Sequence, residues 1–357
     1  DTAKYLARTY SYGGGVGINI SNLRPKGATV NNAALTTTGA VSFMELYSLV
    51  TGLIGMRGRR GALMLNMNIS HPEIEDFIDI KSDLTKVTKA NISVNIDDDF
   101  MNAVQNNKEY DLYFKVETTG EEIRKRVNAR ELFKKLAKNN WNMAEPGMLF
   151  TNKINSWHLM SEDETFEFAG VNPCAEETLP AFGSCNLSSI NLSEFVRNPF
   201  TNKAKFEYER FGEMVREGII FLNEVLDENM ELHPLPQQRE VARELRQVGL
   251  GIMGVADMFI KLGVKYGSKE SIKLIHQIGK IMINEALRQS ALLAKEHGAF
   301  PKYNASAVLK SSFLLANADD DVVKLIEKYG LGNSQLLTIP PPASISTLIG
   351  CSNGVEP

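Results

Sequence analysis

Cysteine and histidine are scarce in this sequence, and both shortages limit the chemistry that it can support. Only three cysteines occur, Cys174, Cys185 and Cys351, and the five histidines include no pair four residues apart. An odd number of thiols without zinc-type spacing does not fit a disulfide framework or a structural metal site. With 357 residues, the chain is also long enough to bury a core without such cross-links. We therefore expect free cysteines and no bound metal.

Long apolar runs and an excess of basic charge are also missing. No run reaches the roughly 18 apolar residues that a membrane span needs, and the start, residues 1–4, lacks the order of a signal peptide. Lys and Arg number 39 against 43 Asp and Glu, so the net charge of −4 offers no broad basic surface to a nucleic-acid backbone. Hydrophobic residues make up 43% and charged residues 23%, which is typical of a globular chain and excludes a disordered one. We expect a cytoplasmic protein without a membrane or nucleic-acid partner.

Alternating apolar residues predict β-strands in three segments. Residues 16–20, 63–69 and 92–96 place apolar side chains at every second position, the period of a strand. The residues between them include glycine, asparagine and serine rather than lysine and glutamate. Such side chains can be satisfied inside a barrel or on a ligand-facing sheet, so we expect these strands close to a site. A sheet with one solvated face is the alternative.

Apolar residues three or four positions apart predict helices over 129–141, 211–226 and 271–297. Residues 97–145 are charged and irregular overall, and we expect them to form an exposed helical excursion. Strands separated by long helical stretches favour a mostly parallel α/β architecture, as two average domains or one large barrel.

Glycines at positions 13, 14, 15 and 17 lead into the first predicted strand. Glycine lets a ligand approach the backbone closely and permits positive φ. A dinucleotide fingerprint needs a strand before the glycines and a helix after them, and here the strand follows. A ligand-facing turn and a tight structural turn both remain open.

Two segments carry cysteines with polar neighbours. Cys174 has Asn172 two residues before it and Glu176 two residues after it, and an extended segment would place all three side chains on one face. A thiol, an amide and a carboxylate together suggest reactive chemistry rather than packing. Cys185 follows in the segment 183–189, where a small buried cysteine is the alternative.

A proline-rich turn lies near the end of the sequence, at residues 340–346. Prolines stiffen the turn, and its two serines and successive backbone N–H groups can face an anion. A rigid loop without a ligand is an equally good interpretation of the residues alone.

Taken in this order, these segments resemble the catalytic α-chain of ribonucleotide reductases. The resemblance is carried by residues 13–27, 57–62, 71–72, 172–176, 184–192, 249–251 and 341–357. It implies the ten-stranded α/β barrel of the ribonucleotide reductase and glycyl radical enzyme type, with a finger loop through its centre. The first and last barrel strands are not in residues 1–357. We therefore expect a single catalytic barrel domain, incomplete at both ends, from the middle of a longer reductase.

The resemblance implies catalytic roles for four residues. Cys174, at the tip of the finger loop, matches the cysteine that becomes a thiyl radical and abstracts the ribose 3′ hydrogen. Glu176 matches the carboxylate that takes the 3′-hydroxyl proton, and Asn172 matches the amide that hydrogen-bonds to the substrate. Cys185 matches one member of the thiol pair that supplies reducing equivalents. The implied reaction reduces ribonucleoside di- or triphosphates to 2′-deoxyribonucleotides for DNA synthesis.

Substrate and effector contacts also follow from the resemblance. The implied substrate-binding residues are Gly15, Pro173, Ala175, Pro341, Pro342, Ala343, Ser344, Ile345 and Ser346. Pro342 and Ala343 stand where the family usually has threonine and glycine, which leaves fewer N–H donors for phosphate. Segments 21–28 and 82–89 match the two loops that relay the identity of the bound deoxynucleotide or ATP effector. Arg24 resembles the arginine that meets effector phosphate; pairing with a surface acid is the alternative.

Cys174 cannot generate its own radical, so the resemblance also implies a radical source. The run 176–180, the short interval to Cys185 and the motif 57–62 look most like the adenosylcobalamin-dependent class. A separate metal-containing radical subunit is the alternative. A thioredoxin-like thiol reductant and a homodimer are further expected partners. Residues 1–12 contain no second reducing cysteine, so a non-catalytic nucleotide-binding fragment that needs a complementary chain is the alternative function.

Overall fold

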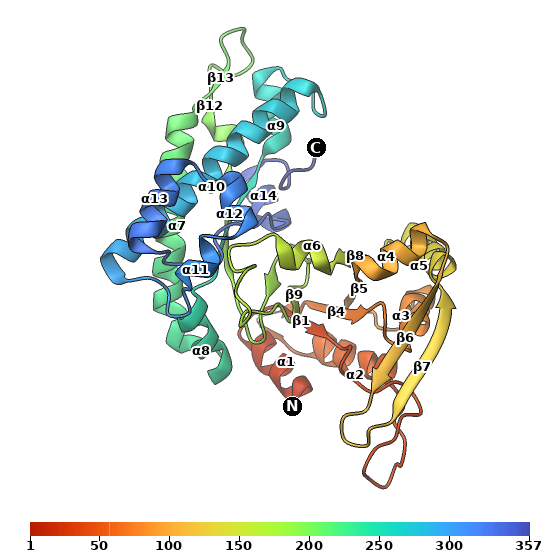
Figure 1. Cartoon of the computed structure of the whole chain (residues 1–357). Coiled ribbons are helices and arrows are strands. Elements are labelled where there is room, and N and C mark those ends of the chain that lie inside the picture. The colour runs from red at the N-terminus through yellow and green to blue at the C-terminus, as the bar shows by residue number, and fades with distance from the viewer. Residues whose placement is uncertain (57) are drawn as a thin grey trace. The chain divides into compact units, whose positions relative to one another are not determined.

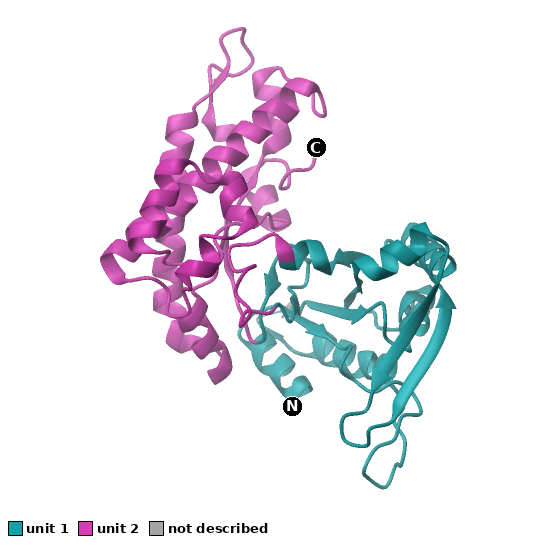
Figure 2. Cartoon of the chain, viewed as in Figure 1, with its two compact units in different colours: residues 1–155, 168–181 teal, residues 156–167, 182–357 magenta. Residues whose placement is uncertain are grey.

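The chain folds into two compact units. The structure, a computed structural model, describes residues 1–56 and 58–357, so Arg57 of the 57–62 motif lies outside the described residues. Unit 1 contains residues 1–155 and 168–181, and unit 2 contains residues 156–167 and 182–357 (Figure 2). Each unit has its own cluster of buried apolar side chains, so each is described by itself.

Unit 1 is built around a parallel sheet. Its elements are α1 (Thr2–Ser11), β1 (Val16–Asn19), α2 (Ala40–Leu53), β2 (Gly55–Met56), β3 (Arg59–Arg60), β4 (Leu63–Asn68), α3 (Ile74–Asp79), a 3₁₀ turn (Ile80–Ser82), β5 (Asn91–Ile96), α4 (Asp98–Gln105), β6 (Glu109–Lys115), β7 (Glu122–Asn128), α5 (Ala129–Met143), β8 (Gly147–Phe150), α6 (Thr151–Ser156), β9 (Gly170–Val171) and β10 (Thr178–Leu179). Four strands pair in the order β1-β4-β5-β8, and every pairing is parallel (Figure 1). The three predicted strands are thus confirmed as β1, β4 and β5, which are neighbours in one sheet.

The two faces of this sheet differ as the alternation predicts. Leu65, Ile92 and Val94 are among the residues that point into the apolar core, where they pack with α2, α3 and α5 side chains. The opposite face carries glycine, asparagine and serine, because side chains alternate along each strand. Asn66 and Ser93 at the centre of that face are 1% and 4% exposed, whereas Asn68 and Asn91 at its ends are exposed. The alternative of a sheet with one solvated face therefore does not hold for the centre of the sheet.

The segment 97–145 contains more strand than its sequence suggested. Helices α4 and α5 lie at its two ends, and between them β6 and β7, each of seven residues, form an antiparallel hairpin (Figure 1). Phe100 and Leu112 are fully buried in the unit 1 core, whereas charged side chains such as Arg124 face outward. The helices and the hairpin of this segment therefore pack on the unit 1 core with their apolar side.

Unit 2 is mainly helical. Its elements are β11 (Asn186–Asn191), a 3₁₀ turn (Leu192–Phe195), β12 (Val196–Arg197), β13 (Lys205–Phe206), α7 (Tyr208–Asn229), a 3₁₀ turn (Met230–Leu232), α8 (Pro236–Leu245), β14 (Val248–Met253), α9 (Val255–Leu262), α10 (Lys269–His297), α11 (Ala305–Val308), α12 (Ser312–Asn317), α13 (Asp320–Tyr329) and α14 (Ala343–Ile349). Strands β11 and β14 pair in parallel, and α7 covers both of them while packing along α10 (Figure 1). The helices expected over 129–141, 211–226 and 271–297 are confirmed as α5, α7 and α10.

The α/β class is confirmed, but the closed barrel is not. A barrel requires every strand to be hydrogen-bonded on both edges. In the part of the chain that the structure describes, β1 and β8 each have one strand neighbour in their sheet, and the β11–β14 pair forms a separate sheet. None of the described helices combines the length and apolar character needed to span a bilayer.

Candidate functional site

Cys174 lies in the turn of a short hairpin in unit 1. Strands β9 and β10 pair antiparallel, and the Asn172 N–H donates to the Glu177 carbonyl at 3.0 Å. Inside the turn, the Ala175 N–H donates to the Asn172 carbonyl at 3.1 Å, and Ala175 has a left-handed φ of 65°. The segment 172–176 therefore bends back on itself, and it is not the extended segment that would place all three side chains on one face by alternation. These hydrogen bonds bring Asn172 and Glu177 together, so the residues between them cannot be extended.

The side chain of Asn172 helps to close this turn. Its Oδ1 accepts a hydrogen bond from the Glu177 N–H at 3.1 Å. An asparagine that caps a nearby backbone N–H in this way stabilises a turn that would otherwise lose a hydrogen bond. The amide NH₂ of Asn172 is still a donor, so the residue can fix the turn and contact a ligand hydroxyl at once.

The thiol of Cys174 is exposed at this turn. Although the sulfur reaches the surface, the surrounding protein still desolvates it, and the nearby Glu176 charge opposes ionisation; both effects raise the pKa of Cys174. A nucleophilic cysteine needs the opposite shift, toward thiolate. The site thus favours a thiol that keeps its hydrogen at neutral pH.

Gly17 on β1 and Gly15 just before it let the hairpin lie directly on the sheet. A methyl group on Gly17 would stand 1.6 Å from the Val171 carbonyl oxygen, and one on Gly15 would stand 2.6 Å from Pro173 Cγ. Heavy atoms cannot approach so closely, so glycine is needed at position 17, and at position 15 as long as Pro173 faces it. The predicted site residues Gly15, Asn172, Pro173, Cys174, Ala175 and Glu176 are therefore brought together in unit 1.

Asparagine side chains organise the rest of the polar face. Asn66 Nδ2 donates to Asn95 Oδ1 at 3.1 Å, and Asn95 Nδ2 donates to Asn68 Oδ1 at 2.8 Å. On the first residue of β5, Asn91 Nδ2 donates to the Pro173 carbonyl at 2.9 Å. The sequence places Asn91 on the polar side of a strand, but nothing in its spacing shows that it reaches the cysteine turn.

Cys185 belongs to unit 2, where glycines again allow a close approach. The partly buried thiol precedes β11, and a methyl group on Gly249 of β14 would stand 3.0 Å from Cys185 Sγ and 2.5 Å from Thr338 Cγ2. The Thr338 N–H donates to the Leu250 carbonyl at 3.1 Å, so the chain leading to the proline-rich turn runs along β14. Unit 2 thus holds Cys185 beside the segment that enters residues 340–346.

The proline-rich turn is the beginning of helix α14. Pro342 is the N-cap, and the Ser346 N–H donates to the Pro342 carbonyl at 2.7 Å. The N–H groups of Ala343, Ser344 and Ile345, in the first turn, are left without helical acceptors, as at any helix start. Ser344 is exposed, whereas Ser346 is buried and its hydroxyl donates to the Ala343 carbonyl at 3.1 Å. Of the two serines, Ser344 is thus the better placed to meet a ligand.

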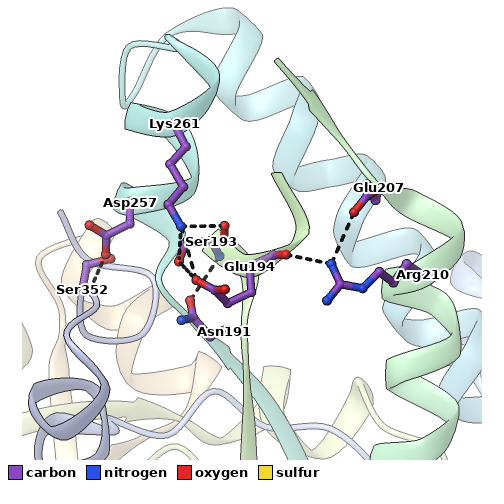
Figure 3. A network of polar contacts seen from close by, with 8 residues as sticks. All are labelled: Asn191, Ser193, Glu194, Glu207, Arg210, Asp257, Lys261 and Ser352. Atoms are coloured by element: carbon purple, nitrogen blue, oxygen red, sulfur yellow. Dashed lines mark hydrogen bonds and ion pairs between the residues drawn. The ribbon is translucent and has the colours of Figure 1, made fainter. Parts of the chain in front are cut away.

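The chain after α14 is anchored to α9 by a polar network (Figure 3). Asp257 accepts a hydrogen bond from the Ser352 N–H, and the Gly254 N–H donates to the Ser352 carbonyl at 2.9 Å. Nearby, Lys261 Nζ donates to the Ser193 carbonyl at 3.0 Å and pairs with Glu194 at 3.3 Å. The Asp257 and Gly254 contacts fix the chain that follows the proline-rich turn, whereas Lys261 joins α9 to the 3₁₀ turn Leu192–Phe195.

Arg24 contacts the turn of the β6–β7 hairpin. Its guanidinium donates to Thr118 Oγ1 at 2.9 Å, and the Thr29 N–H donates to Glu121 at 2.9 Å. Hydrogen bonds from Thr29 lower the pKa of Glu121 most, and the nearby Arg24 charge adds to this effect. The segment 21–28 is therefore held against the hairpin turn, with Arg24 close to an acid.

All three cysteines are free thiols. Across residues 1–56 and 58–357, no group of three or more His, Cys, Asp or Glu side chains gathers in a way that could hold a metal ion.

The fold and the site define an α/β protein whose glycine-bearing sheet supports an exposed thiol next to a carboxylate. The family model described as "Ribonucleotide reductase, barrel domain" matches residues 1–357. The chain belongs to this ribonucleotide reductase family.

Curated relatives carry the same family name. The chain is 35% identical to a vitamin B12-dependent ribonucleoside-diphosphate reductase of Thermoplasma acidophilum, over 100% of this chain and 43% of the relative. It is 32% identical to a reductase of the same name from Mycobacterium tuberculosis, over 97% and 46%. It is 31% identical to a vitamin B12-dependent ribonucleotide reductase of Streptomyces coelicolor, over 100% and 41%. The chain thus spans less than half the length of these relatives.

Proposed function

We propose that this chain is the catalytic barrel segment of a ribonucleotide reductase that makes 2′-deoxyribonucleotides by thiyl-radical chemistry. The observation that carries the proposal is the Cys174 turn. It presents an exposed thiol, which stays protonated, beside Glu176 on a rigidly docked hairpin. Hydrogen-atom transfer needs an S–H bond, whereas nucleophilic catalysis needs a thiolate.

In the proposed reaction, the Cys174 thiyl radical takes the hydrogen atom from C3′ of the ribose and becomes a thiol. Glu176 then accepts the proton of the 3′-hydroxyl, while the Asn172 amide holds the substrate by a hydrogen bond. Loss of that proton makes the radical carbon electron-rich, so the 2′-hydroxyl, once protonated by one thiol of the reducing pair, can leave as water. A general base in the same turn as the radical carrier suits this sequence of steps.

Reduction of the 2′ carbon needs two electrons and two protons. By the family resemblance Cys185 supplies one thiol of the pair, which ends as a disulfide. Cys174 then returns its hydrogen to C3′ and is again a radical. A thioredoxin-like reductant would restore the thiol pair for the next turnover.

The substrate is proposed to be a ribonucleoside di- or triphosphate. The first turn of α14, with Ser344 exposed and three N–H groups free of helical acceptors, is the proposed phosphate contact, within the implied set Pro341 to Ser346. Pro342 removes one N–H donor from this turn. Two of the relatives above are named as diphosphate reductases, which favours the diphosphate.

Adenosylcobalamin is the proposed radical source, since the names of the relatives above include vitamin B12. When bound, it would supply the unpaired electron that turns the Cys174 thiol into a thiyl radical. The exposed sulfur of Cys174 fits a source that approaches from outside the hairpin. A radical delivered by a separate metal-containing subunit is the alternative.

Regulation and assembly complete the proposal. Arg24 is proposed to bind the phosphate of a deoxynucleotide or ATP effector, with segments 21–28 and 82–89 as the relay to base selection. Exposed apolar residues along α2 support a homodimer. We also propose that β1, β4, β5 and β8 belong to a ten-stranded barrel in the complete protein, which would work in the cytoplasm.

The test is a substitution of the thiol in the full-length protein that contains this chain. With adenosylcobalamin, dithiothreitol and a ribonucleoside diphosphate or triphosphate, we expect Cys174→Ala to lower deoxynucleotide formation by at least about 1,000-fold, because loss of an essential catalytic group has effects of this size. Equilibrium dialysis should show nucleotide binding retained. Cys351→Ala, which removes a thiol outside the proposed machinery, is the control and should turn over normally. Turnover by Cys174→Ala near the wild-type rate would contradict the proposal.

A further inference from the structure

A side-chain hydrogen bond from β5 attaches the cysteine turn to the sheet. Asn91 Nδ2 donates to the Pro173 carbonyl at 2.9 Å. That carbonyl belongs to the peptide unit that leads into Cys174, and peptide units are planar. Holding this oxygen in place therefore also holds the plane of the Pro173–Cys174 peptide bond, which contains the Cα of Cys174.

Pro173 is restrained at two further points. Its ring fixes φ and packs on Gly15, where a methyl group would stand 2.6 Å from Pro173 Cγ. The ring thus limits movement of the turn toward β1, and the Asn91 bond limits rotation of the peptide that follows. Together these contacts restrain the backbone that leads into Cys174.

The backbone around Asn91 is itself held on both sides by an ion pair. Lys81 Nζ donates to the Ala90 carbonyl at 2.5 Å, and Glu145 Oε1 accepts from the Ile92 N–H at 2.8 Å. Lys81 and Glu145 pair at 3.1 Å, with side chains only 13% and 24% exposed. Lys81 also donates to the Val87 carbonyl at 2.9 Å, inside the segment 82–89. A partly buried pair that also binds backbone groups holds its position better than a surface pair.

We propose that Asn91 is a positioning residue for Cys174, acting through the Pro173 carbonyl. The inference rests on the proposed thiyl role of Cys174. It assigns Asn91 no contact with the substrate: the residue sets where the sulfur stands relative to the ribose C3′. Because the ion pair that holds Asn91 also binds Val87, the segment 82–89 and the cysteine turn share one support.

The test compares two variants with a matched amide deletion in the full-length enzyme. Asn91→Ala removes the donor, and Asn91→Asp keeps the shape but places a carboxylate against the Pro173 carbonyl. Asn68→Ala is the control, because Asn68 bonds to Asn95 on the same sheet and not to the cysteine turn. We expect both Asn91 variants to lower kcat by about 10- to 100-fold with KM changed less than about threefold, since small misplacements of a reacting group have effects of this size.

A 3′-deuterated substrate separates positioning from a general loss of structure. With the sulfur misplaced, hydrogen abstraction becomes slower than the other steps, so the isotope effect on kcat should rise in the Asn91 variants and stay unchanged in Asn68→Ala. An unchanged isotope effect, or a rise in KM with kcat retained, would overturn the proposal, the second result indicating direct substrate binding.

A second readout does not depend on turnover. In cofactor-free protein, we expect the iodoacetamide alkylation rate of Cys174, followed by peptide mass spectrometry, to change by about threefold or more in Asn91→Ala and not in Asn68→Ala, because thiol reactivity follows its environment. Equal rates in wild type and Asn91→Ala would overturn the positioning role. If the wild-type enzyme makes no deoxynucleotide while the alkylation difference holds, the proposed function fails and the positioning role stands.

Discussion

Cys174 and Glu176 lie in the same turn, and the charge of the acid acts directly on the thiol. Desolvation is the larger cause of the raised pKa of Cys174, and the Glu176 carboxylate adds to it. The same carboxylate is the proposed base for the 3′-hydroxyl. One residue can thus keep the hydrogen on the sulfur before reaction and accept a proton during it.

This arrangement gives a prediction for Glu176→Gln. Removing the negative charge should lower the pKa of Cys174, so at a pH below that pKa more thiolate is present and alkylation is faster, by about threefold at roughly pH 8. The rate of iodoacetamide labelling across pH measures this shift, and the difference should disappear at high pH, where both thiols are ionised. Glu109→Gln, which removes an exposed acid elsewhere in unit 1, is the control. A slower reaction in Glu176→Gln than in wild type would contradict the electrostatic assignment.

For individual residues, the sequence predicted the identity of the proposed site residues more successfully than their conformation. The resemblance assigned roles to residues 172–176, and the structure gathers them in one turn. Their bent conformation was not predicted, because it depends on hydrogen bonds between Asn172 and Glu177 and on a left-handed Ala175. Asn91 was visible only as a polar residue at the start of a strand, since its partner Pro173 is distant in sequence and no local pattern joins them.

Among the secondary-structure elements, β1 and β14 both have glycines that let another segment of the chain approach closely, and the segment differs between them. Gly17 on β1 and Gly15 just before it make room for the cysteine hairpin. On β14, Gly251 makes room for the chain leading to α14, since a methyl group there would stand 2.5 Å from the Thr338 carbonyl oxygen. A strand without side chains at these positions lets another backbone lie against its face. Both elements thus act as supports for the residues of the proposed site.

The β1 contact can be tested with Gly17→Ala. The added methyl group would meet the Val171 carbonyl oxygen, so we expect the free energy of unfolding to fall by about 1–3 kcal/mol, the usual cost of overpacking. Urea denaturation of the full-length protein measures the change. Gly279→Ala in α10 is the control, because nothing lies within 4 Å of the added methyl group there. It should raise stability by up to about 1 kcal/mol through helix propensity. Equal stability of Gly17→Ala and wild type would show that the hairpin can move away from β1.

Elements with clear periodicity were predicted well, and two others were not. Strands β1, β4 and β5 and helices α5, α7 and α10 follow their apolar spacing. The β6–β7 hairpin was overlooked, although Tyr110, Leu112 and Phe114 alternate, because the many charges around them suggested an exposed helical segment. Helix α14 has too few residues for a periodic signal, and its prolines suggested a turn, but proline is tolerated where a helix begins.

At the scale of the whole molecule, helix α2 carries an exposed apolar surface within the part of the chain that the structure describes. Phe43, Leu46, Leu49 and Leu53 are spaced three or four residues apart and are 39%, 44%, 58% and 73% exposed. Residues with this spacing share one face of a helix. An apolar helix face of this kind is typical of an interface between subunits and supports the proposed homodimer.

The dimer can be tested with Leu49→Glu. A charge in the centre of an apolar interface would be buried without a partner, so we expect the dimer to dissociate, with a Kd raised by at least about 100-fold, equivalent to about 2.7 kcal/mol. Sedimentation velocity of the full-length protein over a concentration series measures this. Leu315→Glu, an exposed leucine of α12 in unit 2, is the control and should leave the sedimentation coefficient unchanged. Dimers of unaltered affinity in Leu49→Glu would exclude α2 from the interface.

The contacts of Gly15 and Gly17 restrict amino-acid substitutions in different ways. Gly15 faces the ring of Pro173, so a larger residue at one position can in principle be matched by a smaller residue at the other. Gly17 faces the carbonyl oxygen of Val171, which every amino acid carries. No substitution of Val171 can make room for a larger residue at position 17. Position 17 should therefore be kept as glycine in any mutagenesis library.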